Sequence, residues 1–344
     1  MASLTKPKYT VAVIKKSTSS TKTTTTTTTK KYDITNAVTS LSLDEPEKGI
    51  AQKVNIQLAN VYHEGSYLTG IIQVHDIIYV YADTGSGPKE VFRGYVWTKK
   101  YAKDTERELQ LTCYDRLIYL QESEEYKYFS SGKSTESIFK TLCSSKGITL
   151  SYKYDSIKHG KVVIRGTLAD AFTTDLIDNV RKKKGTRGVI RYTKGTMEVF
   201  TEGKNNSTIY KFTKGSEGNI IKSTHEITLD GITTKVIILG SEKENKAAPI
   251  KATVKGDTAK YGTIQKILTS TDSDKLATLK TEANQIIKDD GSPKKNVVID
   301  AIDNPWVRKG DKIHINDGYV NGYGIVKSVS HDAIKKTMNM EVRM

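Results

Sequence analysis

Residues 304–315 read Asn-Pro-Trp-Val-Arg-Lys-Gly-Asp-Lys-Ile-His-Ile, and a glycine-rich run over residues 317–324 follows them. Pro305 cannot donate a backbone hydrogen bond within a sheet, so it indicates the start or the edge of a strand. Gly310 and Asp311 are typical of a tight turn, and the alternation of polar and apolar residues after them predicts a strand. The stretch predicts the last antiparallel strands of a β-barrel, and none of its patterns is typical of catalysis.

Length and composition indicate a protein of several domains made in a reducing compartment. A chain of 344 residues exceeds the size at which single cores stop growing, near ~250 residues. The two cysteines, Cys113 and Cys143, have no metal-ligand spacing, and the N-terminus has no apolar targeting segment. We therefore expect a soluble protein that is made in the cytoplasm without membrane insertion. Its net charge of +15 favours acidic partners or polyanions.

The first third of the sequence predicts a β domain that follows a polar segment. Residues 1–31 hold a short apolar alternation and then a run of Ser and Thr, which indicates a strand followed by a linker or a long exposed hairpin loop. From residue 32 to 120, alternating positions such as Val54 and Ile56 predict a meander of antiparallel strands. Gly94, inside one of these strands, indicates a bulge or a close backbone approach at a barrel corner.

Helical periodicity replaces the alternation over residues 121–187. Ser134 or Thr135 is expected to cap one helix, which should end at Gly147. Thr167 opens a second helix, and a basic run at its end fits the negative end of the helix dipole, with a nucleic-acid patch as the alternative interpretation. This segment is predicted to be a small α/β domain.

The second β domain is predicted to be discontinuous. Strand patterns recur over residues 188–240 and again over residues 296–344. The lysine-rich residues 241–295 between them contain one helix, capped by Asp272 or Ser273, and are predicted to be a helical insertion. The fold class is therefore α+β and mainly β, with two antiparallel β-barrel domains and small α/β and helical insertions.

Patterns that could carry chemistry are weak. Gly132-Lys133-Ser134 precedes a helix as a phosphate-binding loop does, but Lys127 stands where such a loop needs a glycine. The six histidines have no paired metal spacing, and no recognisable Ser or Cys nucleophile motif occurs. We therefore predict a protein that is not an enzyme and uses no metal or cofactor. The 19 tyrosines against 6 phenylalanines favour protein interfaces.

Four stretches, in order, resemble one protein family. They are Phe-Arg-Gly-Tyr-Val-Trp at residues 92–97, Leu-Gln-Leu-Thr-Cys-Tyr-Asp-Arg-Leu-Ile-Tyr-Leu at 109–120, Tyr-Gly-Thr-Ile-Gln-Lys-Ile at 261–267, and the opening stretch at 305–331. Together they resemble the central baseplate hub protein of contractile phage tails, in the form found in Bacillus and Clostridium prophages and in phage-tail-like bacteriocins. The resemblance covers the chain from about residue 34 onward, and the order of the stretches carries it.

The resemblance implies tail-tube-like barrels in a homotrimer, whose six barrels would adapt the six-fold tail tube to the three-fold spike. It implies the tail tube protein, the spike protein, the tape-measure protein and LysM-like or wedge baseplate proteins as partners. The residues that carry the family pattern are expected to serve turns and packing rather than catalysis. They are Phe92, Gly94, Trp97, Tyr114, Asp115, Tyr261, Gly262, Trp306, Gly310, Asp311, Gly324 and His331.

Two other functions stay open. The first is a tail-associated enzyme that degrades the cell wall, although no catalytic constellation accompanies it in the sequence. The second is a basic nucleic-acid-binding module, which rests on the charge alone, so nucleic acid is not expected as a specific ligand. The sequence also does not distinguish a DNA-carrying phage from a headless bacteriocin.

Overall fold

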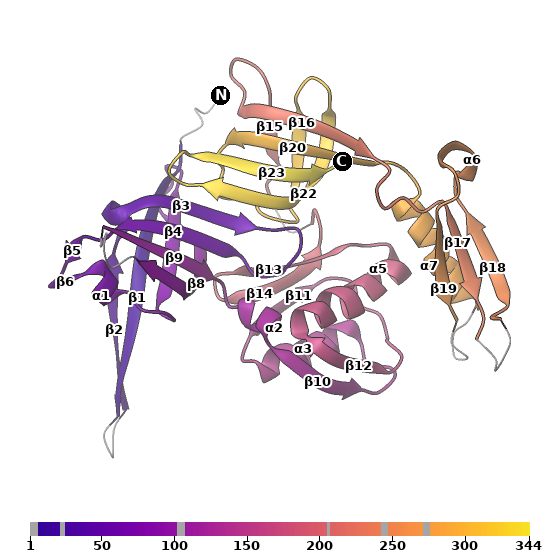
Figure 1. The fold of residues 1–344 in the computed structure, drawn as a ribbon, viewed down its shortest axis with the longest axis horizontal. Coiled ribbons are helices and arrows are strands. Elements are labelled where there is room, and N and C mark those ends of the chain that lie inside the picture. Colours follow the sequence, from indigo (N-terminus) through magenta and orange to yellow (C-terminus); the bar gives the residue numbers. More distant parts are fainter. Residues whose placement is uncertain (1–5, 21–24, 102–106, 205–206, 242–246, 271–275) are drawn as a thin grey trace.

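A computed structural model describes residues 6–20, 25–101, 107–204, 207–241, 247–270 and 276–344. The strands form mainly antiparallel sheets and the helices are few, so the predicted fold class, α+β and mainly β, is confirmed. Figure 1 shows four parts, which we name the first β half, the second β half, the α/β unit and the insertion unit. The two β halves belong to one large sheet.

The first β half is built from an alternating sequence. Its elements are β1 (Lys8–Ser20), β2 (Thr25–Asp33), the short 3₁₀ helix η1 (Thr35–Ala37), β3 (Val38–Glu45), β4 (Lys53–Ala59), β5 (Tyr62–His63), β6 (Ser66–Tyr67), α1 (Leu68–Ile71), β7 (Ile77–Asp83), β8 (Lys89–Tyr101) and β9 (Glu108–Tyr114). Val54, Ile56 and Leu58 of β4 face the core, whereas the residues between them are half-buried. The alternation predicted for this strand is therefore confirmed.

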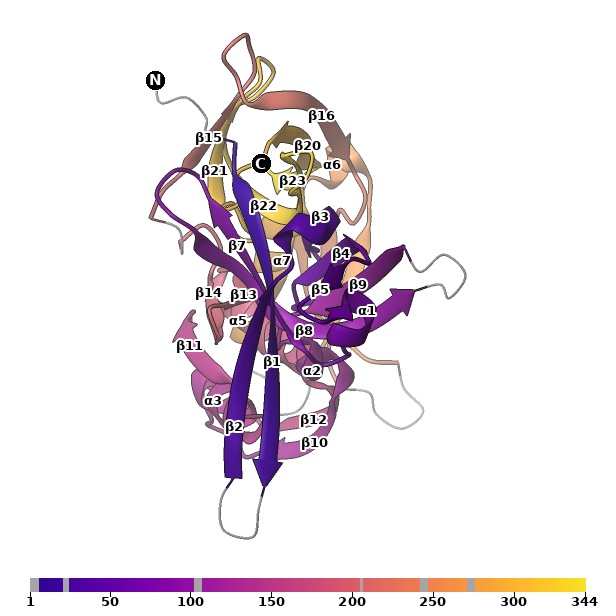
Figure 2. The same cartoon turned by 90° about the vertical axis from the view of Figure 1, so that its left-hand side faces the viewer.

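The Ser/Thr-rich tract is a β-hairpin. Strands β1 and β2 pair antiparallel, with Ser17 opposite Thr28 and Ser20 opposite Thr25. Figures 1 and 2 both show the hairpin extending well beyond the rest of the first β half. Of the two interpretations, the linker was wrong, and the long exposed hairpin is present but is paired as strands over most of the tract, because β-branched threonine favours extended strands and backbone pairing needs no apolar side chains.

The second β half is assembled from two parts of the chain. Its strands are β15 (Tyr210–Thr213), β16 (Ile220–Thr228), β20 (Lys294–Ile302), β21 (Lys312–Asn316), β22 (Asn321–Asp332) and β23 (Thr337–Arg343). One side of β22 pairs with β23, and the other side pairs first with β21 and then with β3. This last contact, in which Val329 lies opposite Glu45, joins the two β halves into one sheet.

The large sheet has open ends. Its order is β16-β20-β23-β22-β3-β4-β9-β8-β7-β1-β2, with β21 and β15 branching from β22. Among the described residues, no strand pairing links the two ends of either β half. Each half is nevertheless wrapped around its own apolar core, and Figure 2 shows the curvature of the second β half.

The α/β unit packs below the junction of the two β halves (Figure 1). It contains α2 (Ile118–Glu122), β10 (Glu124–Phe129), α3 (Thr135–Ser145), β11 (Thr149–Lys153), β12 (Val162–Thr167), α4 (Leu168–Asp170), the π-helical turn η2 (Ala171–Ile177), α5 (Asp178–Lys184), β13 (Gly188–Thr193) and β14 (Thr196–Thr201). Ser134 caps α3, because its Oγ accepts a hydrogen bond from the Ser137 backbone N–H at 3.1 Å. Phe139 and Phe172 stack at 4.3 Å in its core.

Two strand groups predicted in the second β domain pair elsewhere. Strands β13 and β14, over residues 188–201, join β11 in a sheet of the α/β unit, where β11 runs parallel to β14. Residues 235–239 form β17 of the insertion unit. The alternation of a strand identifies the face that it buries and leaves its partner strand undetermined, which explains both differences.

The insertion unit is a small sheet covered by a helix. It contains β17 (Lys235–Leu239), β18 (Ile250–Lys255), α6 (Thr258–Tyr261), β19 (Gln265–Thr269) and α7 (Leu276–Asp290). Leu279 and Ala283 of α7 pack on Val236 and Ile238 of β17. The predicted helix is present within an insertion that is not purely helical, and its predicted cap, Asp272 or Ser273, lies outside the described residues.

Candidate functional site

Three parts of the molecule meet at one buried group of charged residues. We name it the ionic junction and define it as Glu45, Arg191, Arg308, Lys309 and Asp311. Glu45 ends β3 in the first β half, Arg191 lies in β13 of the α/β unit, and the other three lie in the loop before β21. Four of them are buried and Arg308 is 15% exposed, and burying a charge is costly unless it is paired.

Local sequence shapes the loop that carries three of these residues. The Asp311 carboxylate accepts a hydrogen bond from the Arg308 backbone N–H at 2.9 Å and so closes the turn. Gly310 has φ of +85°, which favours glycine, and a Cβ atom there would lie 2.9 Å from the side chain of Val189. The tight turn predicted at Gly310 and Asp311 is present, and it presents the side chains of Arg308 and Lys309 toward the other units.

Arg308 connects the three parts directly. Its Nε donates to Glu45 Oε1 at 2.6 Å, and its Nη2 also contacts this oxygen. Its Nη1 donates to the Tyr192 carbonyl at 3.1 Å and to Thr193 Oγ1 at 3.0 Å, both at the end of β13. Burial alone would raise the pKa of Glu45, but the neighbouring cations Arg308 and Arg191 hold this pKa below its usual value.

The remaining members of the ionic junction also have hydrogen-bond partners. Arg191 Nη1 donates to Asp311 Oδ1 at 2.9 Å. The Lys309 backbone N–H donates to Glu45 Oε2 at 2.8 Å, and its Nζ donates to the carbonyls of Pro46 and Gly49 at 3.1 and 2.9 Å. Such a closed network fixes how the units are placed relative to one another, because each charge has a partner from another unit.

Asp115 lies beside the ionic junction, between β9 and α2. Its two carboxylate oxygens accept hydrogen bonds from the backbone N–H groups of Gln52 at 3.0 Å and Leu117 at 2.8 Å. Burial raises the pKa of this carboxyl group to about 7, against the opposing effect of these two donors. The Asp115 side chain therefore stabilises the turn between β9 and α2. Its raised pKa shows that the charged form is costly to bury there.

We expect Asp115 to make stability depend on pH. Between about pH 4 and 7 the folded protein retains a proton that the unfolded chain has released, so stability should fall as the pH rises through this range. Urea unfolding at pH 5 and pH 8 measures the effect, with Asp115→Asn as the reference that lacks the titrating group. Wild type should lose more stability than Asp115→Asn between the two values, and equal losses would contradict the expectation.

A second polar group, near the ionic junction, joins the first strand to the last hairpin. His331 Nδ1 lies 2.7 Å from Asp303 Oδ1, and its Nε2 lies 3.1 Å from the Val307 carbonyl oxygen. The Tyr9 hydroxyl donates to the other oxygen of Asp303 at 2.6 Å. Burial, together with the Asp303 charge, raises the pKa of Tyr9. His331 therefore holds the loop over residues 303–307 in place.

Four residues of the family pattern lie together in the first β half. Phe92 is buried, and the partly exposed Trp97 contacts the ring of Tyr114 edge-on at 6.3 Å. Gly94 lies in β8, where a Cβ atom would come within 2.2 Å of the Tyr114 carbonyl oxygen. The backbone of β9 thus approaches β8 as closely as a glycine permits.

The other residues of the pattern are dispersed. Tyr261 and Gly262 belong to the insertion unit, where Gly262 has φ of +75° just after α6. Trp306 is half-buried and its Nε1 donates to Thr84 Oγ1 at 3.4 Å. A Cβ atom on Gly324 would lie 2.4 Å from Val342 Cγ1, so β22 and β23 are tightly apposed there.

Sequence reasoning missed Glu45, Arg191, Arg308 and Lys309 as a group. One signal was available, because Glu45 continues the alternation of Leu41 and Leu43 and therefore occupies a core-facing position of its strand. A carboxylate in a core-facing position requires a buried cation. Which cation meets it depends on the tertiary fold.

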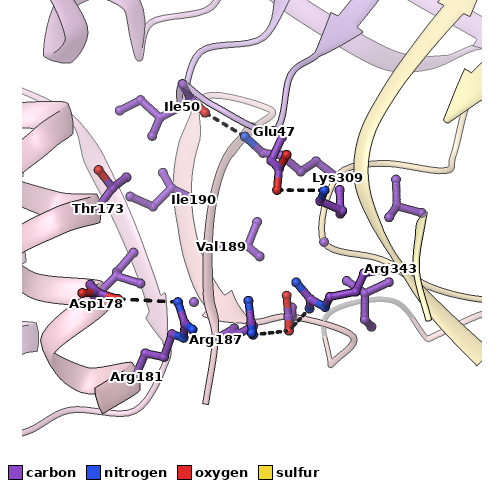
Figure 3. A pocket seen from close by; sticks show the side chains of 18 residues that line it. Glu47, Ile50, Thr173, Asp178, Arg181, Arg187, Val189, Ile190, Lys309 and Arg343 are labelled. Carbon is purple, nitrogen blue, oxygen red and sulfur yellow. Dashed lines mark hydrogen bonds and ion pairs between the residues drawn. The ribbon is translucent and has the colours of Figure 1, made fainter. Parts of the chain in front are cut away.

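A polar cleft lies beside the ionic junction, where the α/β unit faces the second β half (Figure 3). Its volume is about 280 Å³. Among the described residues, no group of three or more His, Cys, Asp or Glu side chains is placed to hold a metal ion. None of the helices within the same residues is long and apolar enough to cross a membrane.

Comparison of the sequence with profiles of protein families assigns the chain to a family. Residues 42–344 match the profile of the family described as YQBQ-like, which is most of the chain. The chain belongs to the YQBQ-like family. The match begins within β3, so the hairpin of β1 and β2 precedes the residues that this YQBQ-like profile matches. No curated protein has a sequence that matches the chain.

Solved structures share the fold of this YQBQ-like protein. A tail protein from Neisseria meningitidis MC58 is 15% identical with a TM-score of 0.69, and the similarity covers 98% of this chain and 96% of that one. The prophage MuSo2 43 kDa tail protein from Shewanella oneidensis is 12% identical with a TM-score of 0.67, covering 98% of both chains. A chain of the Francisella PdpA-VgrG complex is 11% identical with a TM-score of 0.58, covering all of this chain and 53% of that one.

Proposed function

We propose that this protein is a structural component of a phage or phage-tail-like baseplate, and that it acts there as the central hub. Three copies would form a ring that adapts the six-fold tail tube to the three-fold spike and anchors other baseplate proteins. The observation that supports the proposal best is the fold, which matches two tail proteins over 98% of this chain and nearly all of theirs. A likeness over whole chains favours a shared architectural role.

The sheet topology supports the ring. Each chain has two antiparallel β halves with separate cores, so three chains would supply six such halves. Both ends of the large sheet, β2 and β16, pair on one side only among the described residues. Long open strand edges are sites at which another chain can add, which suits a protein that assembles with neighbours.

Within this proposal the residues of the family pattern have structural roles. Gly94, Gly310 and Gly324 allow close backbone packing, and Asp115 and Asp311 close turns. The proposed partners are the tail tube protein, the spike protein, the tape-measure protein and LysM-like or wedge proteins of the baseplate. The net charge of +15 is proposed to face acidic surfaces among them. No observation on the described residues specifically favours the cell-wall-degrading enzyme or the nucleic-acid-binding module.

Size-exclusion chromatography with light scattering tests the hub. We expect a species of three times the 38.2 kDa of one chain, which stays intact when the salt concentration is raised. The trimer should also retain the tail tube or spike protein produced in the same cells. A strict monomer that binds duplex DNA with a steep salt dependence would instead support the nucleic-acid-binding module.

A further inference from the structure

The lining of the polar cleft beside the ionic junction has more cations than carboxylates, and two carboxylates outside the lining, Asp289 and Glu341, pair with Arg181 and Lys327. Five of the residues that line it are cations and three are carboxylates. The cations are Arg181, Arg187, Lys309, Lys327 and Arg343, and the carboxylates are Glu47, Asp178 and Glu202. Figure 3 shows Arg187 and Arg343 on one side of the cleft, on either side of a carboxylate that both contact, which is that of Glu202, and Arg181 lies beside Arg187.

Arg187 has few polar partners for a charged side chain that is only 29% exposed. Its Nε lies 3.9 Å from Glu202 Oε1, and its Nη2 lies 3.8 Å from Asp289 Oδ1. Both distances are too long for hydrogen bonds, and the structure shows no hydrogen bond from this guanidinium to any described residue. Its N–H donors are therefore open to solvent or to a further acceptor in the cleft.

Neighbouring arginines compete for the carboxylates that Arg187 faces. Arg343 Nη2 forms a short contact with the same Glu202 oxygen. Arg181 Nε donates to Asp289 Oδ2 at 2.9 Å. Burial, with the like charges of Arg343 and Arg181, lowers the pKa of Arg187. A further anion in the cleft would relieve this repulsion.

We propose that the cleft binds a single oxyanion, a carboxylate or a phosphate group, at the guanidinium of Arg187, in competition with the Glu202 carboxylate that contacts both Arg187 and Arg343. Guanidinium groups suit such ligands because their N–H donors match the geometry of paired oxygens. The cleft volume of about 280 Å³ is sufficient for a small anionic group. Ile50, Val189 and Ile325 add apolar surface to the lining of the cleft. The proposal does not depend on the hub function.

Titration calorimetry on the full chain tests the site. Inorganic phosphate and glutarate serve as probes, in a buffer without other oxyanions and at constant ionic strength. At least one of the two should bind saturably with one site per chain. Arg187→Gln should weaken this binding about tenfold or more, as loss of a charge-assisted contact implies. The control Arg165→Gln, which alters an exposed arginine on β12, should bind like wild type.

A variant with the opposite expected effect keeps the test decisive if Arg187→Gln does not fold. Glu202→Gln removes the carboxylate that competes for Arg187 and Arg343, so it should bind the probe more tightly than wild type. If phosphate binds more tightly than glutarate, the natural ligand carries a phosphate group. If glutarate binds more tightly than phosphate, the natural ligand carries a carboxylate. Absence of saturable binding, or equal binding by wild type and both cleft variants, would overturn the proposal.

Discussion

Arg308→Met is expected to lower the free energy of unfolding by about 3–5 kcal/mol, because it leaves a buried carboxylate without its main counter-ion. Glu45 is only 4% exposed, and Arg308 Nε donates to it at 2.6 Å. The Lys309 backbone N–H would remain on the other oxygen, but Lys309 Nζ is committed to two carbonyls. Methionine retains much of the length of arginine, so the change mainly removes charge and hydrogen bonds.

Urea unfolding followed by circular dichroism measures this loss, and Arg93→Met is the matched control. Arg93 also forms a close ion pair, to Glu90 Oε2 at 2.6 Å, but its side chain is 34% exposed. Partly exposed pairs contribute about 1 kcal/mol, and Arg93 also lies over the Tyr79 ring at 4.9 Å, so the control should lose much less stability than Arg308→Met. Adding Glu45→Gln to Arg308→Met should recover part of the loss. Similar losses for both arginine variants would show that the ionic junction is not specially costly to disrupt.

Gly94→Ala is expected to cost stability near the upper end of the usual range for overpacking, about 3 kcal/mol. The added Cβ would lie 2.2 Å from the Tyr114 carbonyl oxygen and 2.5 Å from Phe92 Cζ. Tyr114 belongs to the pairing of β9 with both β8 and β4, so its backbone cannot move away without disturbing the sheet. The substitution should therefore loosen the first β half.

Gly160→Ala provides the control for Gly94→Ala. A Cβ atom on Gly160 would meet nothing within 4 Å, and its φ is not positive. We expect a change within about 0.5 kcal/mol, as for ordinary surface substitutions. Thermal unfolding of both variants beside wild type measures the difference. If Gly94→Ala unfolded at the same temperature as Gly160→Ala, β8 and β9 would have room for a Cβ atom at residue 94, which would contradict the expectation.

The sequence predicted features that depend on near neighbours along the chain. The alternation in β4, the Ser134 cap and the turn at Gly310 all follow from residues within a few positions of one another. The predicted end of helix α3 at Gly147 is also present, and Gly147 has φ of +62° just after this helix. These are the interactions that residue spacing encodes directly.

Features that depend on distant partners could not be predicted. Residues 188–201 alternate like any half-buried strand pair, and only the fold shows that β11 is the partner of β14. The ionic junction unites Glu45, Arg191 and Arg308 from three separate units. Charged residues are common in this sequence, so spacing alone does not distinguish a buried ion pair from a solvated one.

The contact between β3 and β22 has a consequence for biosynthesis. Leu43 of β3 pairs with His331, which the ribosome adds almost 290 residues later. A nascent chain therefore holds β3 with one edge unpaired until residues 329–332 have been made. Contacts so distant in sequence also form slowly, so this pairing should be among the last steps of folding. A chaperone that shields β-strand edges would act in this interval, and a prematurely terminated chain would keep an edge prone to aggregation.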